Sequence, residues 1–386
     1  MQYRIRLAVM ALVTALAACG DSDGPRTSAV RVAGDSLSDS GTFGFKATVQ
    51  GSSMADTLIW VDHVADAVGV AALCPRYLAS NADTAALNPD PAYSRCTSHG
   101  VVRARVNVPD TMPGGDASPF SILQQLKDMT AAATFGPEEL LLVDGGGNDV
   151  ADLMRGYLTL ASDAGTAYLG LLGELLTPAQ LQAALLGGES GLAAAGAQYM
   201  EALANLLADQ LVTQALGQGG QRVVVLNIPA LSRTPYFQAM LAQVAQANGG
   251  GDAGATAAAQ VQAMADGWIQ AFNSQLKRRF ASEHRVAVVD LHAELAQWVD
   301  SPSTYGFTNA KDPACPPTGV PDALGLPAYF LADCFAASLS AYPPPTATSP
   351  EWWQTYVFAD DYHGTPRTHL LIGQLVTSTL RARDWL

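Results

Sequence analysis

Three polar residues from two distant parts of the chain have the types that nucleophilic catalysis needs. Ser36 lies in the stretch "VRVAGDSLSDSG", directly after small apolar residues that predict a strand. A serine hydroxyl becomes a nucleophile when a neighbouring base takes its proton. Among the six histidines, His363 in "VFADDYHGTPRTH" is the best placed base, because Asp360 precedes it by three residues. That spacing lets the carboxylate fold back onto the imidazole and fix its tautomer, as in a catalytic triad.

Each of these residues also has a simpler interpretation. Gly, Asp and Ser are ordinary turn formers, so the segment around Ser36 could be a turn with no chemistry. A single histidine in a polar turn, such as His363, is commonly a surface residue. Asp361 is a second candidate for orienting His363, but it lies only two residues away and suits that role less well.

Acyl transfer also needs hydrogen-bond donors aimed at the oxyanion before its charge develops. The backbone N–H of Ser36 is one candidate, and the side-chain amide of Asn148 in "GGGND" is another. Taken alone, this glycine-rich segment is also compatible with a flexible turn. It is not a phosphate-binding loop, because the lysine and the spacing of a Walker motif are absent.

The elements that must position these residues alternate between strands and helices. Short apolar runs predict buried strands at Ala29–Ala33, Leu140–Asp144, Arg222–Asn227 and Val286–Asp290. Helices are predicted at Asp56–Val68 with Asp56 as its cap, at Pro119–Ala133, at Asp149–Leu160, within the Ala- and Leu-rich residues 161–219, and at Thr365–Arg381. Residues 245–258 predict a mobile linker into a helix that ends near Phe280, and residues 74–118 and 300–350 predict loops.

Such alternation is typical of a parallel sheet covered by helices on both faces. Ligands of these folds bind at the carboxyl ends of the strands. Ser36 and Asn148 each follow a predicted strand, so both should project from the same edge of the sheet.

Together the segments resemble the GDSL, or SGNH, hydrolase family. "GDSLSDSG" matches the first block with Ser36 as nucleophile, and "GGGND" matches the third with Asn148 in the oxyanion hole. Asp360 and His363 match the acid and base of the fifth block. The resemblance implies an α/β fold, a three-layer α/β/α sandwich with a mainly parallel five-stranded sheet. It also implies ester hydrolysis without a metal or cofactor, by one domain over residues 29–386 with helical and loop insertions.

The second block departs from the family pattern. In "CTSHGVVRARVN", Val102 and Arg103 stand where the family has glycines, one of which supplies a backbone N–H to the oxyanion hole. We place that donor at Arg103. A side chain restricts the backbone angles that glycine adopts freely. The guanidinium could bind an anionic group of the substrate or simply face water.

The N-terminus has the layout of an export signal. Arg4 and Arg6 precede the apolar run of residues 7–18, which is too short to span a bilayer. The run ends in "LAACG", which resembles the lipobox that directs a lipid onto Cys19; a plain secretory signal is the alternative. Gly20, rather than Asp, follows the cysteine, which implies the outer membrane of a Gram-negative bacterium. We therefore expect a signal peptide at 1–18, a flexible tether at 19–28 and a lipid anchor.

The other four cysteines are an even number in a chain predicted to be exported, which suggests disulfides. The preferred pairing is Cys74 with Cys96 and Cys315 with Cys334, and two other pairings stay open. Zinc is disfavoured, because no CxxC occurs and no histidine lies at ligand spacing from them.

These observations predict a serine ester hydrolase that works through a Ser-His-Asp triad and an acyl-enzyme. Its substrate would be a lipid ester or an acylated glycan, and residues 161–219 could form either an acyl-binding cap or ordinary core. The formal charge of −14 argues against binding nucleic acid. The alternative is a surface lipoprotein without catalysis that binds lipid or glycan in the same cleft, as Val102 and Arg103 would favour.

Overall fold

The computed structural model describes residues 26–109 and 112–386. Its centre is a parallel sheet in the order β1-β4-β5-β6, built from Val- and Leu-rich segments that are buried on both faces. The strands are β1 (Ala29–Ala33), β4 (Glu139–Val143), β5 (Arg222–Leu226) and β6 (Val286–Val289). Each end lies within one residue of its prediction.

The number of strands differs from the five that the family resemblance implies. Residues 97–101 run parallel to β1 on its free side, where the N–H of Val32 donates to Thr97 O at 3.0 Å and the N–H of His99 donates to Val32 O at 2.8 Å. Only the single bridge between Val32 and Ser98 forms there. The Cys96 disulfide precedes this segment and a tight turn follows it, so it is too short to form a regular strand.

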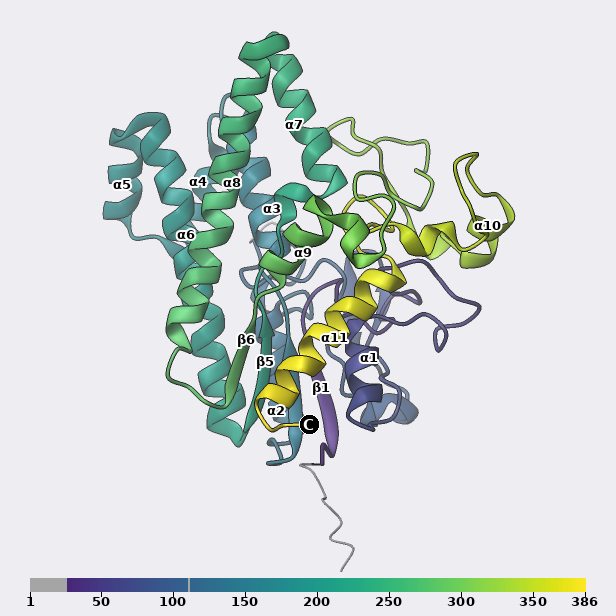
Figure 1. The fold of residues 1–386 in the computed structure, drawn as a ribbon. Coiled ribbons are helices and arrows are strands. Elements are labelled where there is room, and N and C mark those ends of the chain that lie inside the picture. Colours follow the sequence, from purple (N-terminus) through teal and green to yellow (C-terminus); the bar gives the residue numbers. More distant parts are fainter. Residues whose placement is uncertain (1–25, 110–111) are drawn as a thin grey trace, which may run out of the picture.

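Helices cover both faces of the sheet (Figure 1), which gives three layers. Alternate strand residues, such as Val30 and Leu142, point to the face that carries α1 (Trp60–Ala67), α9 (Leu291–Asp300) and α11 (Pro366–Ala382). The residues between them, such as Leu141, face α2 (Ile122–Ala132), α3 (Gly147–Leu158), α6 (Gly188–Gln210) and α8 (Gly251–Arg279). The predicted α/β sandwich is therefore confirmed.

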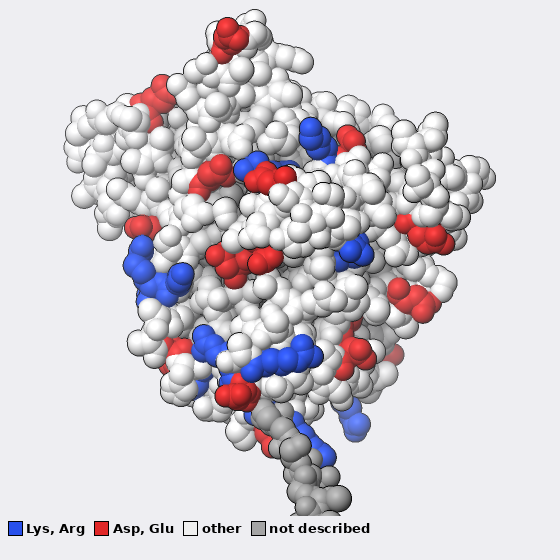
Figure 2. Space-filling view, in the orientation of Figure 1, with Lys and Arg blue, Asp and Glu red and all other residues white. Residues whose placement is uncertain are grey.

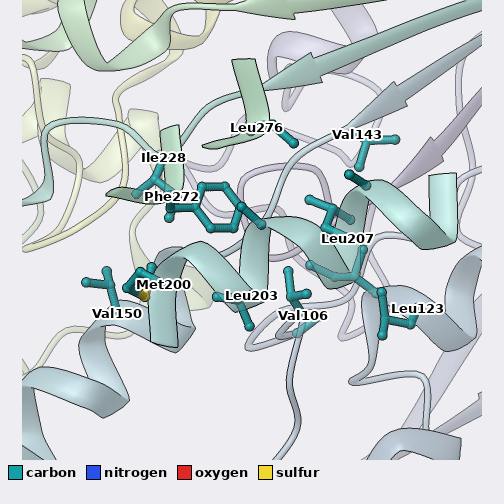
Figure 3. Close-up of a cluster of buried hydrophobic side chains, with 14 of the residues drawn as sticks. Val106, Leu123, Val143, Val150, Met200, Leu203, Leu207, Ile228, Phe272 and Leu276 are labelled. Carbon is teal, nitrogen blue, oxygen red and sulfur yellow. The ribbon is translucent and has the colours of Figure 1, made fainter. Parts of the chain in front are cut away.

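The Ala- and Leu-rich region contributes to the core mainly through α6, whereas α5 (Pro178–Leu186) is largely exposed. The region forms α4 (Thr166–Leu175), α5 and α6. Figure 3 shows Leu203 and Leu207 of α6 among side chains that include Val106, Val143 and Leu276. Core packing, rather than an acyl-binding cap, therefore accounts for α6.

The predicted mobile linker at 245–258 is wrong. The helix α7 (Pro235–Ala247) and α8 are joined by only three residues, and the two helices run side by side (Figure 1). A Cβ atom on Gly254 would lie 2.2 Å from the carbonyl oxygen of Ala245. The small residues therefore allow two helices to approach closely, rather than leaving the chain without structure.

Some helix ends also differ from the predictions. The helix predicted from Asp56 begins at Trp60, and the Asp56 carboxylate instead accepts the hydroxyls of Ser52 and Ser53. The carboxylate of Asp62 accepts the N–H of Ile59 at 2.9 Å and so satisfies the first turn. α2 begins three residues later than predicted, and α3 begins and ends two residues earlier.

The two loop regions contain short elements and the two predicted disulfides. A hairpin of β2 (Tyr77–Asn81) and β3 (Thr84–Leu87) lies within 74–118, and α10 (Ala336–Ala341) lies within 300–350. Cys74 is bonded to Cys96, and Cys315 to Cys334. Single turns of 3-10 or π-helix complete the chain at Pro91–Arg95, Gly115–Ala117, Leu211–Ala215, Leu216–Gln218, Leu231–Arg233, Pro302–Tyr305, Leu331–Asp333 and Trp352–Thr355.

Disulfides are typical of extracellular and periplasmic proteins. No helix within residues 26–109 and 112–386 is both long and apolar enough to span a bilayer. On the face drawn in Figure 2, acidic and basic side chains are interspersed among uncharged residues. The predicted signal peptide, Cys19 and most of the tether lie outside the described residues.

Candidate active site

The strand order places a cavity at the carboxyl ends of β1 and β4. Residues 97–101 lie on one side of β1 and β4 lies on the other. The chain therefore leaves β1 toward one side of the sheet and returns on its other side to form β4. Ligands of open parallel sheets bind at such a switch point. The cavity has a volume of about 410 Å³, and its lining includes Ser36, Arg103, Asn148, Asn227 and His363.

Ser36, His363 and Asp360 form one chain of hydrogen bonds. Ser36 Oγ lies 2.7 Å from His363 Nε2, and His363 Nδ1 lies 2.8 Å from Asp360 Oδ2. The other carboxylate oxygen of Asp360 accepts the backbone N–H of Tyr362 at 2.8 Å and that of His363. The three-residue spacing thus forms a tight turn in which the carboxylate fixes both the backbone and the ring of His363.

The charges around the imidazole favour its protonated form. Burial lowers the pKa of His363, but the Asp360 carboxylate, with smaller contributions from Asp35 and Asp361, raises it above its usual value. Burial and the neighbouring Asp360 raise the pKa of Asp361 to about 7. Within the described chain the Asp361 side chain makes no hydrogen bond to the ring, so Asp360 is the carboxylate that contacts His363.

Asn148 lies at the start of α3, where it faces the same cavity. Its Nδ2 donates to the carbonyl of Ala104 at 3.0 Å, which uses one of the two N–H groups of the amide. The glycines before it allow the chain to approach its neighbours closely: a Cβ on Gly145 would lie 2.3 Å from Ile122 Cδ1. Among the described residues, no acceptor binds the backbone N–H of Ser36 or of Arg103.

Arg103 adopts the backbone conformation that glycine favours. Its φ is +69°, and the N–H of Ala104 donates to Val101 O at 3.0 Å across the turn that contains it. The guanidinium donates at 3.2 Å both to the carbonyl of Ala82 and to Asp83 Oδ1 in the β2–β3 hairpin. Its charged end is therefore bound at the surface by the hairpin, and Arg103 also belongs to the lining of the cavity.

Comparison with models of protein families gives a match to GDSL-like Lipase/Acylhydrolase over residues 30–376. The chain belongs to this family. Membership indicates that the protein hydrolyses an ester, without defining which one. A search of curated proteins found no match.

Two carboxylates in the family blocks hold the second block in place, a role that the sequence analysis missed. Asp39 of "GDSLSD" accepts the N–H of Val102 at 2.8 Å, and Asp149 of "GGGND" accepts those of Val106 at 3.0 Å and Asn107 at 2.8 Å. Burial raises the pKa of Asp39 to about 6 and that of Asp149 to about 7. Both residues lie inside the sequence blocks that resemble the family, and that position could have indicated a role at the site.

A buried carboxyl group lies directly beneath the nucleophile loop. A Cβ on Gly34 would lie 1.8 Å from Asp144 Oδ1, so this position of the first block excludes any side chain. The hydroxyl of Ser38 donates to Asp144, and Trp60 Nε1 donates to Ser38 Oγ at 3.1 Å. Burial, followed by the neighbouring Asp35 carboxylate, raises the pKa of Asp144 well above its ordinary value.

Arg105 fixes the carbonyl side of Arg103. Its Nη1 donates to Arg103 O at 2.5 Å, while Nε and Nη2 donate to the two carboxylate oxygens of Asp152 at 2.5 and 3.0 Å. A bidentate pair of this kind holds a guanidinium in one orientation. The peptide plane that follows Arg103 is therefore held in place, and the N–H of the preceding residue, Val102, is held by Asp39.

Proposed function

We propose that the protein is a serine ester hydrolase in which Ser36 is the nucleophile, His363 the general base and Asp360 the residue that orients it. The observation that supports this assignment is the continuous hydrogen-bond chain from Ser36 Oγ through the imidazole to Asp360. Residues 29–386 would form the hydrolase domain. The family match supports ester hydrolysis in general.

The reaction would proceed through an acyl-enzyme. Ser36 Oγ attacks the ester carbonyl while its proton passes to His363 Nε2. The Asp360 carboxylate stabilises the imidazolium that forms, which then protonates the leaving alcohol as the C–O bond breaks. A water molecule, deprotonated by the same imidazole, attacks the acyl-enzyme and releases the acid and free Ser36.

The oxyanion would be held by three donors: the backbone N–H groups of Ser36 and Arg103 and the second amide N–H of Asn148. The first two have no other acceptor in the described chain, and the third belongs to an amide already oriented by Ala104. Loss of one such donor typically costs about 3 kcal/mol of transition-state stabilisation. A donor from the backbone of Arg103 does not require glycine, provided that the residue keeps its positive φ.

The acyl group would lie in the cavity itself, whose volume is about 410 Å³. Leu231 and Tyr362 also line a small apolar recess with Met154, Phe237 and Met240, but its volume of about 20 Å³ is too small for an acyl chain. We propose an acyl chain of several carbons that lies in the main cavity. A series of p-nitrophenyl esters from acetate to palmitate tests this: a maximum in kcat/KM beyond acetate supports the lipid ester, and a preference for acetate supports an acylated glycan.

Ser36→Ala tests the catalytic assignment. The variant should lose esterase activity and labelling by a fluorophosphonate, while its thermal midpoint stays unchanged. Ser52→Ala, at an exposed serine of a neighbouring loop, is the matched control and should keep both. Unchanged turnover of Ser36→Ala would contradict the mechanism.

The second candidate is a surface protein without catalysis that binds lipid or glycan in the same cleft. Val102 and Arg103 at the glycine positions of the second block favour it. Absence of fluorophosphonate labelling in the folded protein at neutral pH would support this alternative. In either case we propose export with a lipid on Cys19 and anchoring to an outer membrane, which mass spectrometry of the mature N-terminus tests.

A further inference from the structure

A second cavity, separate from the candidate active site, lies beyond the nucleophile loop. Its volume is about 730 Å³, against about 410 Å³ for the first, and the two have no lining residue in common. The loop that carries Ser36 lines the first cavity, and its continuation from Ser40 to Lys46 lines the second. α1 and the β2–β3 hairpin form other walls. Volumes of this size are typical of small-molecule sites.

Exposed apolar side chains gather around this cavity. Leu58, Leu78 and Tyr93 line it and are 40%, 51% and 38% exposed, although they come from three separate segments. Met54 and Leu73 extend the apolar wall. Single exposed apolar residues are common, but several that converge on one cavity mark a binding surface. This wall fits an alkyl chain.

The deep end of the cavity is polar and its hydrogen-bonding capacity is only partly used. Lys46 Nζ donates to Asp62 Oδ2 at 2.8 Å, and the two side chains are only 4% and 7% exposed. The same Oδ2 also accepts the N–H of Ile59. In the described chain, Lys46 Nζ has no second partner and Asp62 Oδ1 has none. A hydroxyl group, which both donates and accepts, complements such a pair.

The charges at this end favour an uncharged head group. Lys46 and Asp62 neutralise each other. Burial lowers the pKa of His63, which also lines the cavity, so this ring is neutral. Asp66, which is exposed at the rim, therefore gives this end of the cavity a net negative charge. An anionic ligand would meet repulsion from Asp66 without a free cation to offset it.

We propose that this cavity is a second, non-catalytic site that binds a single-chain amphiphile with an uncharged, hydroxyl-bearing head. The alkyl chain lies against Leu58 and Leu78, and a head hydroxyl reaches the Lys46–Asp62 pair. This site is independent of the proposed catalysis, because it uses none of the residues that the mechanism names.

The test uses a diazirine-bearing analogue of 1-O-dodecylglycerol, an ether that an esterase cannot cleave, below its critical micelle concentration. Photo-crosslinking of the full chain followed by mass spectrometry should label residues 54–93. Crosslinks confined to the peptides that carry Ser36, Asn148 or His363 would place the ligand in the first cavity and overturn the proposal.

Affinity measurements with 1-O-dodecylglycerol provide a second readout. Leu78→Asp should raise the Kd at least tenfold, and Leu58→Asp should do the same if the first variant does not fold. Leu87→Asp is the matched control, since Leu87 is 45% exposed on the same hairpin but does not line the cavity. Equal affinities of Leu78→Asp and Leu87→Asp would overturn the site.

The head group is tested with dodecanoate, which has the same chain length and an anionic head. At pH 8 dodecanoate should bind at least tenfold more weakly than 1-O-dodecylglycerol. Equal or tighter binding of dodecanoate would overturn the assignment of an uncharged head.

Discussion

The carboxylate of Asp39 accepts the backbone N–H of Val102 at 2.8 Å, so the first sequence block holds the second block next to the nucleophile. The other oxygen of Asp39 accepts the N–H groups of Gly41 and Thr42 at 2.8 and 2.7 Å. One buried side chain thus links the turn after Ser36 to the turn that contains Arg103. The geometry of the proposed oxyanion hole depends on this link.

Replacement of Asp39 should therefore impair catalysis more than substrate binding. Asp39→Ala leaves the N–H of Val102 without its acceptor and frees the Arg103 turn, so kcat should fall at least tenfold while KM changes little. Lost buried hydrogen bonds of this kind cost about 1–3 kcal/mol each, so the thermal midpoint should also fall. Steady-state kinetics and thermal melts measure the two effects.

Asp83→Ala is the matched control for this variant. It removes the exposed carboxylate that pairs with the Arg103 guanidinium, and such surface pairs contribute about 0–1 kcal/mol. Its kcat should stay within about threefold of the wild type. A similar loss of kcat in both variants would show that the side chain of Arg103, rather than its backbone, matters.

Arg103→Gly should keep the esterase activity. The proposed role of Arg103 is its backbone N–H, and glycine adopts the observed φ of +69° freely. Relief of the left-handed conformation contributes about 1 kcal/mol, which roughly offsets the lost surface ion pair. We expect an unchanged or slightly raised thermal midpoint and kcat/KM within threefold. A tenfold loss would mean that the guanidinium takes part in substrate binding.

The sequence predicts the sheet well because its strands are buried on both faces. β4, "ELLLV", and β5, "RVVVL", are continuous apolar runs that end in turn residues, and nothing in the surrounding chain competes with that pattern. The Asp360–His363 spacing is equally local: both residues lie in one turn, so the contact follows from the sequence separation.

The features that the sequence does not predict depend on contacts between distant segments. Gly254 belongs to a helix, α8, because α7 packs against it. The composition of residues 245–258, taken alone, favours a linker. The Asp39 and Asp149 carboxylates act on backbone groups of residues 102–107, which only the folded chain brings near. The positive φ of Arg103 occurs within that segment and runs against its residue type.

The pH dependence of hydrolysis should reveal the environment of His363. The imidazole must be neutral to accept the Ser36 proton, and Asp360 raises its pKa above the usual 6.5. Activity should therefore fall as pH decreases through a value above 6.5. Asp361→Asn removes a second carboxylate whose own pKa is about 7, so the acid limb should shift to lower pH with the maximal rate retained. An acid limb that stays fixed in this variant, measured as kcat/KM from pH 5 to 9, would contradict the assignment.

Asp144 should limit stability at alkaline pH. Its pKa in the folded state is raised by burial and by Asp35, so the native protein holds a proton that the unfolded chain releases near pH 4. Stability should then decrease as pH rises above that value. Asp144→Asn keeps the shape and a donor toward Asp35 but cannot ionise.

The variant should consequently be more stable than the wild type at pH 8, and the difference should become small near pH 4, where residue 144 of the unfolded wild-type chain is about half protonated. Urea unfolding at the two pH values measures this difference. Asp128→Asn, which alters a carboxylate that accepts the Tyr77 hydroxyl far from the nucleophile loop, is the control and should lack this gain at pH 8. A loss of stability in Asp144→Asn at pH 8 would mean that the folded protein needs the negative charge beneath Gly34, and that Asp144 is ionised there.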